Sequence, residues 1–253
     1  MRATVKRAFD LLAALVLTIV LSPLIAVLSL LIFLQDFRSP FFIAGRVGRG
    51  RRPFRMCKFR SMVVNASKTG VMSTAGDDKR ITPIGAFVRR FKLDEVPQLF
   101  NIITGSMSFV GPRPNVESEV KLYSEVEGGL LRVRPGITDF ASIVFSDEGD
   151  ILTGSDDPDR DYNLMIRPWK SRLGLHYIRT QSLLGDMRIM LLTGVAVVNR
   201  AWALRSIERA LEGTDADPQV VEVSRRAAPL APALPPGVTA ETWERHLDYG
   251  EGP

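Results

Sequence analysis

Cysteine and histidine are nearly absent from this sequence of 253 residues. Cys57 is the single cysteine, which excludes a disulfide framework and any zinc or iron–sulfur site built from several cysteines. The two histidines, His176 and His246, lie seventy residues apart, which argues against a histidine-rich metal site and against a Ser-His-Asp triad. Any catalysis is therefore expected to depend on carboxylates, basic groups and a hard metal ion.

Acidic residues are missing from one long stretch. Phe37–Arg60 contains eight lysines and arginines and no aspartate or glutamate. The whole chain has a net charge of +5, and residues 212–253 hold eight acids against three bases, a net −5, so residues 1–211 carry +10. Such a stretch is either a solvated face or a binding site for anions such as nucleic acid, lipid headgroups or a phosphorylated substrate.

Charge is also missing from Leu11–Leu34, a run of 24 residues rich in leucine, valine and alanine. As a helix this run is about 36 Å long, enough to cross the hydrocarbon core of a bilayer, so the sequence predicts contact with a membrane. Ser22 and Pro23 lie in the middle of the run. Proline removes a helical hydrogen bond and kinks the axis.

Basic residues flank the apolar run on both sides, with Lys6 and Arg7 before it and residues 38–60 after it. Because lysine and arginine favour the cytoplasmic side of a membrane, these charges pull both ends of the run to the same face. Two interpretations stay open from these residues alone. One is a helix broken at Ser22-Pro23 that enters the membrane and returns, and the other is a kinked helix that spans it once. In both, the main body of the chain is cytoplasmic.

Short strands and helices are expected after the apolar run. The patterns predict strands over Phe41–Val47 and Pro53–Met62 and a helix over Ile84–Phe91. Glu117–Glu127 is expected to be helical, and Ser146–Asp161, which holds seven acids, to be an exposed loop. The fold class is therefore α+β and mostly helical, with a small β element.

Pro97 decides where a second helix begins. Since proline is tolerated only in the first turn, this helix must begin close to Asp94. Asp94 and Glu95 then lie at the positive end of the helix, where a carboxylate is favoured in its ionised form. The plainer interpretation is that they are two ordinary acids of a first helical turn.

Three regions are expected along the chain. Residues 1–36 form the membrane helix, and residues 37–212 form a cytosolic domain that includes an amphipathic helix at the membrane interface over Ser182–Leu204. Residues 213–253 contain six prolines and few large apolar groups, so a disordered tail is expected.

Five groups of residues follow one another in order. They are Lys58-Phe-Arg-Ser-Met62, Asp78-Lys-Arg-Ile-Thr-Pro-Ile-Gly85, Leu93-Asp-Glu-Val-Pro-Gln-Leu99, Gly105-Ser-Met-Ser-Phe-Val-Gly-Pro-Arg-Pro114 and Arg134-Pro-Gly-Ile-Thr138. Together with the Lys-Arg-x-x-Asp opening at Lys6 and the Ser-Pro pair, this pattern resembles the bacterial sugar transferase family, the monotopic phosphoglycosyl transferases. The resemblance covers roughly residues 6–198.

The resemblance implies a reaction, a cofactor and a topology. The family transfers a sugar 1-phosphate from a nucleotide-sugar, usually a UDP-sugar, to polyprenyl (undecaprenyl) phosphate, which starts assembly of a capsule, exopolysaccharide or O-antigen. It uses magnesium (Mg2+). Its members are monotopic in the bacterial inner membrane, with a re-entrant helix broken at the Ser-Pro pair and a catalytic domain on the cytoplasmic face. The implied partners are the sugar donor, the polyprenyl acceptor and membrane lipid, without nucleic acid.

The resemblance also assigns roles to individual residues. Asp94 and Glu95 match the catalytic dyad, with Asp94 as the nucleophile that forms a phosphosugar-enzyme intermediate and as a magnesium ligand. Arg89 and Arg113 match positions that could clamp phosphate in a fork geometry. The remaining candidates for phosphate binding are Lys58, Arg60 and Arg134, for which a structural or lipid-headgroup role is an equal alternative.

One departure from the family and one alternative function complete the expectations. Relatives often continue Pro-Gly-Ile-Thr with glycine, whereas this chain has Asp139 and then an acidic stretch that reaches Asp161. If this stretch meets the sugar or the base, the sugar cannot be inferred from relatives. The competing hypothesis is a non-enzymatic, membrane-tethered basic domain that binds anionic lipid or nucleic acid. The sequence specifies neither the sugar, the nucleotide, the oligomeric state nor the glycan pathway.

Overall fold

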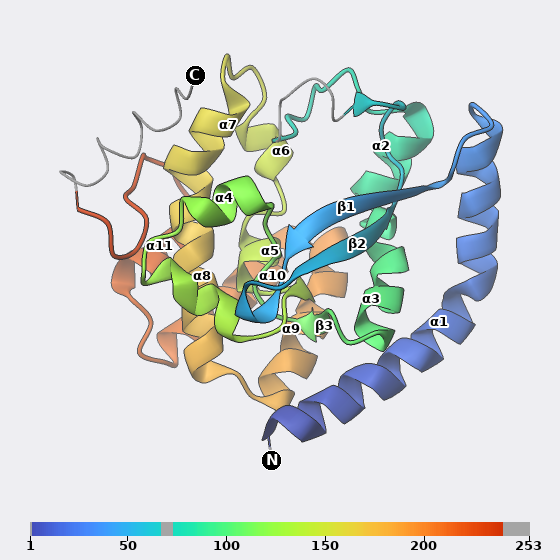
Figure 1. The fold of residues 1–253 in the computed structure, drawn as a ribbon. Coiled ribbons are helices and arrows are strands. Elements are labelled where there is room, and N and C mark those ends of the chain that lie inside the picture. The colour runs from blue at the N-terminus through green and yellow to red at the C-terminus, as the bar shows by residue number, and fades with distance from the viewer. Residues whose placement is uncertain (1, 67–72, 240–253) are drawn as a thin grey trace.

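The computed structural model describes residues 2–66 and 73–239, and in them the chain is mostly helical, with two small sheets (Figure 1). The expected mostly helical fold is confirmed at this level. The α-helices are α1 (Arg2–Leu34), α2 (Pro83–Arg90), α3 (Leu99–Ile103), α4 (Glu117–Lys121), α5 (Phe140–Val144), α6 (Glu148–Ile151), α7 (Pro158–Asp161), α8 (Arg167–Thr180), α9 (Leu183–Val198), α10 (Arg200–Glu212) and α11 (Pro218–Arg225). The strands are β1 (Phe41–Val47), β2 (Pro53–Phe59), β3 (Ser108–Val110) and β4 (Gly136–Thr138). Short 3-10 helices are η1 (Arg49–Arg51), η3 (Leu93–Gln98) and η4 (Glu127–Arg132), and η5 (Tyr162–Ile166) is a π-helical turn.

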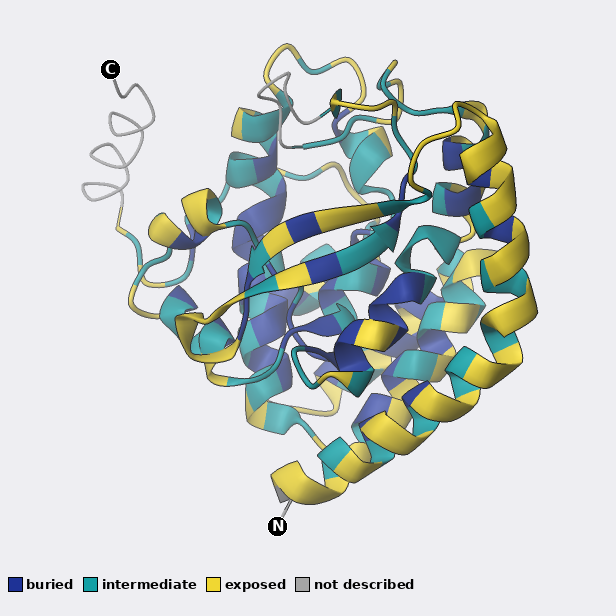
Figure 2. Ribbon diagram, turned by 45° about the vertical axis from the view of Figure 1, so that its right-hand side comes forward, coloured by how far each residue is buried: buried dark blue, intermediate teal, exposed yellow. Residues whose placement is uncertain are grey.

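α1 is a long apolar helix that bends around one side of the body (Figure 1). By length and composition it could cross a membrane, and only 11% of its most apolar window is buried. Figure 2 shows its outer side exposed along most of its length. A run of exposed leucines, valines and isoleucines is costly in water, so this side of α1 suits contact with lipid.

The expected helix break at Ser22-Pro23 is not seen, because α1 continues through Pro23. Proline has no N–H to donate to the carbonyl of Ile19, four residues earlier. The Ser22 hydroxyl donates to that carbonyl at 2.8 Å and so replaces the missing hydrogen bond. The Ser-Pro pair is therefore accommodated inside one continuous helix.

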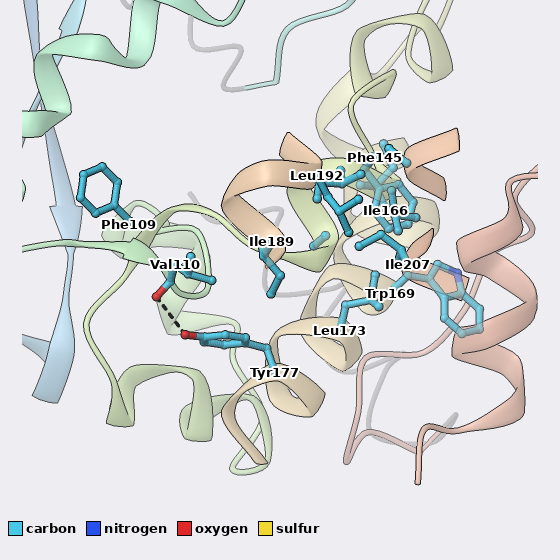
Figure 3. Close-up of a cluster of buried hydrophobic side chains, with 14 of the residues drawn as sticks. Phe109, Val110, Phe145, Ile166, Trp169, Leu173, Tyr177, Ile189, Leu192 and Ile207 are labelled. Carbon is cyan, nitrogen blue, oxygen red and sulfur yellow. Dashed lines mark hydrogen bonds between the residues drawn. The ribbon is translucent and has the colours of Figure 1, made fainter. Parts of the chain in front are cut away.

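Lys6 fastens the start of α1 to the body. Its ammonium is ion-paired with Asp186 of α9 and donates to the Val110 carbonyl of β3 at 3.1 Å. The Tyr177 hydroxyl of α8 lies 2.8 Å from Asp186 Oδ1 and 3.1 Å from the same Val110 carbonyl, the contact drawn in Figure 3. Four elements distant in sequence thus meet at one buried cluster.

Arg7 and Asp10 extend this attachment. Arg7 donates to the carbonyls of Ile102 at 2.6 Å and Ile103 at 3.0 Å, at the end of α3, where a cation favours the negative helix terminus. Asp10 is buried and accepts a hydrogen bond from the Ser108 hydroxyl of β3 at 2.8 Å. The Lys-Arg-x-x-Asp opening therefore anchors α1 to the body, a role that the sequence analysis did not assign.

Both predicted strands form. β1 and β2 pair antiparallel from Phe41 opposite Phe59 to Val47 opposite Pro53, so β2 ends three residues before the expected Met62. The predicted helix at Ile84–Phe91 corresponds to α2. α4 is shorter than expected and ends at Lys121.

The second sheet joins two of the sequence motifs, because β3 and β4 pair in parallel. A Cβ atom on Gly136 would lie 2.2 Å from the Gly111 nitrogen, and one on Gly111 would lie 2.5 Å from the Arg134 carbonyl oxygen. Glycine is therefore required at both positions. This close approach fixes the direction in which Pro112 and Arg113 leave the strand.

A single large core draws on residues from Ala14 to Val220, and much of it lies between α5, α8, α9 and α10 (Figure 3). The expectation of a disordered tail is wrong for residues 213–239. Val220 of α11 is buried in this core, and the backbone N–H of Ala233 donates to the Leu164 carbonyl at 2.9 Å. Residues 240–253 lie outside the described residues.

Two further expectations concern the acidic stretch and the interface helix. Ser146–Asp161 is not a simple exposed loop, because it contains α6 and α7 and buries Leu152 fully. Ser182–Leu204 is helical, as α9 and the start of α10. Its large apolar side chains include Leu184 and Val198, which are 78% and 90% exposed. The position of this helix at a membrane interface stays a prediction.

Asp186→Asn is expected to lower the free energy of unfolding by about 1.5–3 kcal/mol, because the pair with Lys6 loses a charge-assisted hydrogen bond in a buried site. Thermal unfolding of the protein in detergent measures the effect. The exposed pair of Glu117 with Lys121 offers a matched control. Glu117→Gln should change the stability by at most about 0.5 kcal/mol. Equal, small effects of both substitutions would show that Lys6 and Asp186 do not hold α1 in place.

Candidate active site

A cavity of about 910 Å³ gathers the carboxylate pair and most of the predicted basic residues. β1 and β2 contribute Arg46, Met56 and Lys58 to its wall, and α2 and η3 contribute Arg89 and both carboxylates. Arg113 enters from the segment after β3, and further parts of the wall come from α1, α4, α5, α6, η5, α8 and α9. Segments far apart in the sequence therefore converge on one site.

Asp94 and Glu95 occupy the first turn of η3, where Pro97 predicted them to be. The element is a 3-10 helix that continues into α3, rather than one regular α-helix. Lys92, directly before it, has φ of 56° and ψ of 20°, the left-handed region that non-glycine residues rarely adopt. This turn reverses the chain between α2 and η3 and directs the dyad into the cavity.

Glu95 is held by two cations. Arg113 Nη2 lies 2.5 Å and Lys58 Nζ lies 3.4 Å from Glu95 Oε1. Burial would raise the pKa of Glu95, but Arg113 and Lys58 outweigh this and hold the pKa well below its usual range. Glu95 is therefore ionised, and it positions both cations at the cavity wall.

Asp94 has the opposite environment. Burial and the adjacent Glu95 raise its pKa, although Lys58, Arg89 and Arg113 act against this. The helix end was expected to favour the ionised form, so for Asp94 desolvation overrides that effect. Among the described residues, the Asp94 carboxylate has no hydrogen bond or ion pair. Two adjacent carboxyl groups with divergent pKa values are typical of sites where one group reacts and the other holds charge in place.

Three of the five predicted phosphate ligands line the cavity, namely Lys58, Arg89 and Arg113. Burial and the nearby Arg113 lower the pKa of Lys58 from 10.5 to about 8. Further basic side chains that line the same cavity were not singled out from the sequence: Arg46, Arg90, Lys92 and Lys170. The site is thus rich in cations.

Arg60 and Arg134 do not line the cavity and have structural contacts instead. Arg60 forms two hydrogen bonds with the Asp36 carboxylate, at 2.5 and 2.7 Å, and donates to the Ser39 carbonyl at 2.8 Å. Arg134 donates to the Gly105 carbonyl at 2.8 Å. For both residues the structure favours the structural alternative over phosphate binding.

Asp94 and Glu95 offer the hard oxygen donors that magnesium prefers, and Asp94 is free to use them. Within residues 2–66 and 73–239 no group of three or more histidine, cysteine, aspartate or glutamate side chains could enclose a metal ion. Magnesium in phosphoryl-transfer sites is commonly held by one or two carboxylates together with substrate phosphates. The residues present fit that mode of binding.

The acidic stretch after Asp139 also reaches the cavity. Asp147, Glu148 and Asp150 line it, and Glu148 is ion-paired with Lys170 of α8. From the sequence alone, contact between this stretch and the substrate was left open. No local pattern marks Glu148 and Lys170 as partners, because they are 22 positions apart with two helical elements, α7 and η5, between them.

A carboxylate dyad in a cavity lined with cations, close to a long apolar helix, is typical of an enzyme that acts on anionic substrates next to a membrane. The bacterial sugar transferase family matches residues 1–200, and the chain belongs to this family. The family predicted from the motifs is confirmed.

Relatives in this family carry informative names. The chain is 34% identical to the exopolysaccharide production protein ExoY of Sinorhizobium fredii, over 76% of this chain and 84% of that one. It is 34% identical to the UDP-glucose:undecaprenyl-phosphate glucose-1-phosphate transferase of Escherichia coli, over 74% and 39%. It is 39% identical to the UDP-N-acetylgalactosamine-undecaprenyl-phosphate N-acetylgalactosaminephosphotransferase of Aeromonas hydrophila, over 56% and 34%. The chain thus spans little more than a third of the last two relatives, and the sugars in their names differ.

Deprotonation of Lys58 is expected to lower the activity at alkaline pH. Because its pKa is about 8, Lys58 is protonated at neutral pH and loses its charge as the pH rises, which weakens binding of an anionic substrate. The profile of kcat/KM, which reports the free enzyme, should fall between about pH 7.5 and 9. Lys58→Arg keeps the charge throughout this range and should shift the fall to higher pH. A wild-type profile that stays flat through this range would contradict the assignment.

Proposed function

We propose that this protein transfers a sugar 1-phosphate from a UDP-sugar to undecaprenyl phosphate and thereby starts assembly of a surface glycan. The observation that carries the proposal is the unpaired Asp94 carboxylate beside Glu95, which Arg113 and Lys58 hold ionised in a cavity rich in cations. The names of the Escherichia coli and Aeromonas hydrophila relatives specify a UDP-sugar and undecaprenyl phosphate, which supports both substrates.

In the first step, a carboxylate oxygen of Asp94 attacks the phosphorus atom that carries the sugar. The bond from this phosphorus to the oxygen bridging the two phosphates breaks, and UMP leaves with the electron pair. An aspartyl phosphosugar remains on the enzyme. A raised pKa makes Asp94 a stronger nucleophile once ionised, and Arg113, Lys58 and Arg89 neutralise the charge that develops on the phosphate oxygens.

In the second step, a phosphate oxygen of undecaprenyl phosphate attacks the same phosphorus and releases the Asp94 carboxylate. The lipid acceptor needs an apolar approach to the dyad. Leu21 of α1 and Met190 and Val197 of α9 line the cavity, so apolar side chains from two largely exposed helices lead to the reactive groups. This arrangement supports an acceptor that stays in the membrane.

A screen of UDP-sugars tests the function. The full chain in nanodiscs is supplied with undecaprenyl phosphate and with UDP-glucose, UDP-galactose or UDP-N-acetylgalactosamine, and UMP release is measured. Release that requires the polyprenyl phosphate supports the transferase. Salt-sensitive binding of oligonucleotides without turnover of any UDP-sugar would support the binding module instead.

Asp94→Asn should abolish turnover while the protein stays folded and membrane-bound, because an amide is neither a competent nucleophile nor a strong magnesium ligand. Wild-type enzyme incubated with a radiolabelled sugar donor and no acceptor should retain label after denaturation, whereas the variant should retain none. Glu95→Gln should also be severe, because Arg113 and Lys58 lose their anchor. A near-normal rate for Asp94→Asn would refute the covalent scheme.

Magnesium is proposed to bind Asp94 together with phosphate oxygens of the substrate. When bound, the ion would supply charge neutralisation on the diphosphate. Turnover should therefore stop in excess EDTA and return on addition of magnesium. Activity that persists in the chelator would contradict the metal assignment, and the Asp94 substitution would still test the nucleophile separately.

The re-entrant topology is proposed because both ends of α1 attach to one body. Lys6 fixes the first end to Asp186, and Arg60 fixes Asp36, just beyond the other end. A helix that spans a bilayer once places its ends on opposite sides, about 30 Å or more apart across the hydrocarbon core. A body that holds both ends on the cytoplasmic side is compatible with a helix that enters and returns.

Labelling of engineered cysteines tests this topology. In a Cys57→Ser background, Thr4→Cys and Ser39→Cys should both resist an impermeant maleimide in intact cells and react after lysis. Pro23→Ala removes the ring that clashes with the preceding turn and favours a bent helix, so part of the population should straighten, span the membrane and expose position 4. Labelling of Thr4→Cys in intact cells with Pro23 present would indicate a single-pass anchor.

A further inference from the structure

One wall of the cavity is built from an ion pair that the proposed reaction does not use. Glu148 at the start of α6 pairs with Lys170 of α8, and the Lys170 ammonium lies 5.1 Å from the centre of the Tyr162 ring. All three residues line the cavity, where the side chains of Lys170 and Glu148 are 16% and 32% exposed. The pair is thus largely shielded from solvent yet faces the space that a substrate would fill.

The pair adjoins the phosphate-binding groups. Burial would raise the pKa of Glu148, but Lys170 first and then Arg113 hold it below its usual range, so Glu148 is ionised and within electrostatic reach of Arg113. Glu119, from α4, lines the same part of the cavity and is within reach of both Lys170 and Glu148. A ligand group attached to a phosphate on Arg113 would therefore meet two carboxylates and an ammonium.

Another group of cavity residues has a different character. α2 and the turn that follows it contribute Arg89, Arg90 and Lys92. A group of cations suits phosphate oxygens, including those of the departing UMP. Carboxylates repel phosphate but accept hydrogen bonds from hydroxyl groups. An ammonium group donates hydrogen bonds to hydroxyl oxygens. The Glu148 side therefore suits the uncharged, hydroxyl-rich part of the substrate.

We propose that Glu148 and Lys170 form the subsite that binds the hydroxyl groups of the transferred sugar. This inference rests on the proposed function. Glu148 accepts a hydrogen bond from one sugar hydroxyl, and Lys170 donates a hydrogen bond to a neighbouring hydroxyl. The Tyr162 ring packs against the Lys170 ammonium. Because UDP-sugars differ in the arrangement of these hydroxyl groups, this subsite determines which sugar is accepted.

Equilibrium binding measurements distinguish contacts with the transferred sugar from contacts with the nucleotide. The full chain in nanodiscs, with Asp94→Asn to prevent turnover, is titrated with UMP and with UDP-glucose, UDP-galactose and UDP-N-acetylgalactosamine. Glu148→Gln should weaken the UDP-sugar that binds best by about 10- to 100-fold, the value of one charge-assisted hydrogen bond. The affinity for UMP should change by less than about twofold, because UMP lacks the transferred sugar. Lys170→Met is the reciprocal substitution and should show the same pattern.

Glu117→Gln is the matched control, since it removes a carboxylate from an exposed lysine pair outside the cavity and should leave every affinity unchanged. Unchanged UMP affinity also shows that the variants are folded. An equal loss for UMP and the UDP-sugars would overturn the proposal and place the nucleoside at this wall. Unchanged UDP-sugar affinity would overturn it as well. The proposed function is judged separately, by UMP release from the unsubstituted enzyme.

Discussion

The attachment of α1 through Lys6 is the constraint on which the site depends. Lys6 and Tyr177 both contact the Asp186 carboxylate and the Val110 carbonyl at the end of β3, and Val110 lies three residues before Arg113. The close approach of β3 to β4 then fixes the exit of the chain toward the cavity. An unpaired lysine or carboxylate in this buried cluster would be costly, so the cluster holds only when all its members meet. Membrane helix and active site are therefore parts of one structure.

Local sequence rules predicted the parts of the fold that depend on near neighbours. Local residue patterns predicted β1 and β2, and Pro97 placed the dyad in a first helical turn. The rules failed where the partner is distant. The role of Arg60 was left open between phosphate binding and a structural contact, because nothing local connects it with Asp36, 24 residues earlier. The tail after residue 213 was expected to be disordered because its composition is poor in large apolar residues. Composition alone does not reveal that α11 packs on a distant part of the core.

The same limit applied within the site. Motifs located the dyad and the cations that share its cavity, since Lys58 and Arg113 each stand in a recognisable group of residues and Arg89 lies between two such groups. They assigned Arg113 to phosphate binding but left the role of Arg134 open between phosphate binding and a structural contact. The difference arises from tertiary structure: Arg134 bonds the Gly105 carbonyl, whereas Arg113 bonds Glu95.

The distribution of ion pairs explains how a cavity with several carboxylates could accept a diphosphate. Glu95 is neutralised by Arg113 and Lys58, Glu148 by Lys170, and Asp147 by Arg200. Each pair lowers the repulsion that an incoming anion would meet. Across the described parts of the chain, Arg89 and Asp94 keep neither an ion pair nor a hydrogen bond, although they lie within electrostatic reach of each other. The cavity thus places an unpaired carboxylate within electrostatic reach of an unpaired guanidinium, the two kinds of group that attack at phosphorus and binding of an anionic substrate require.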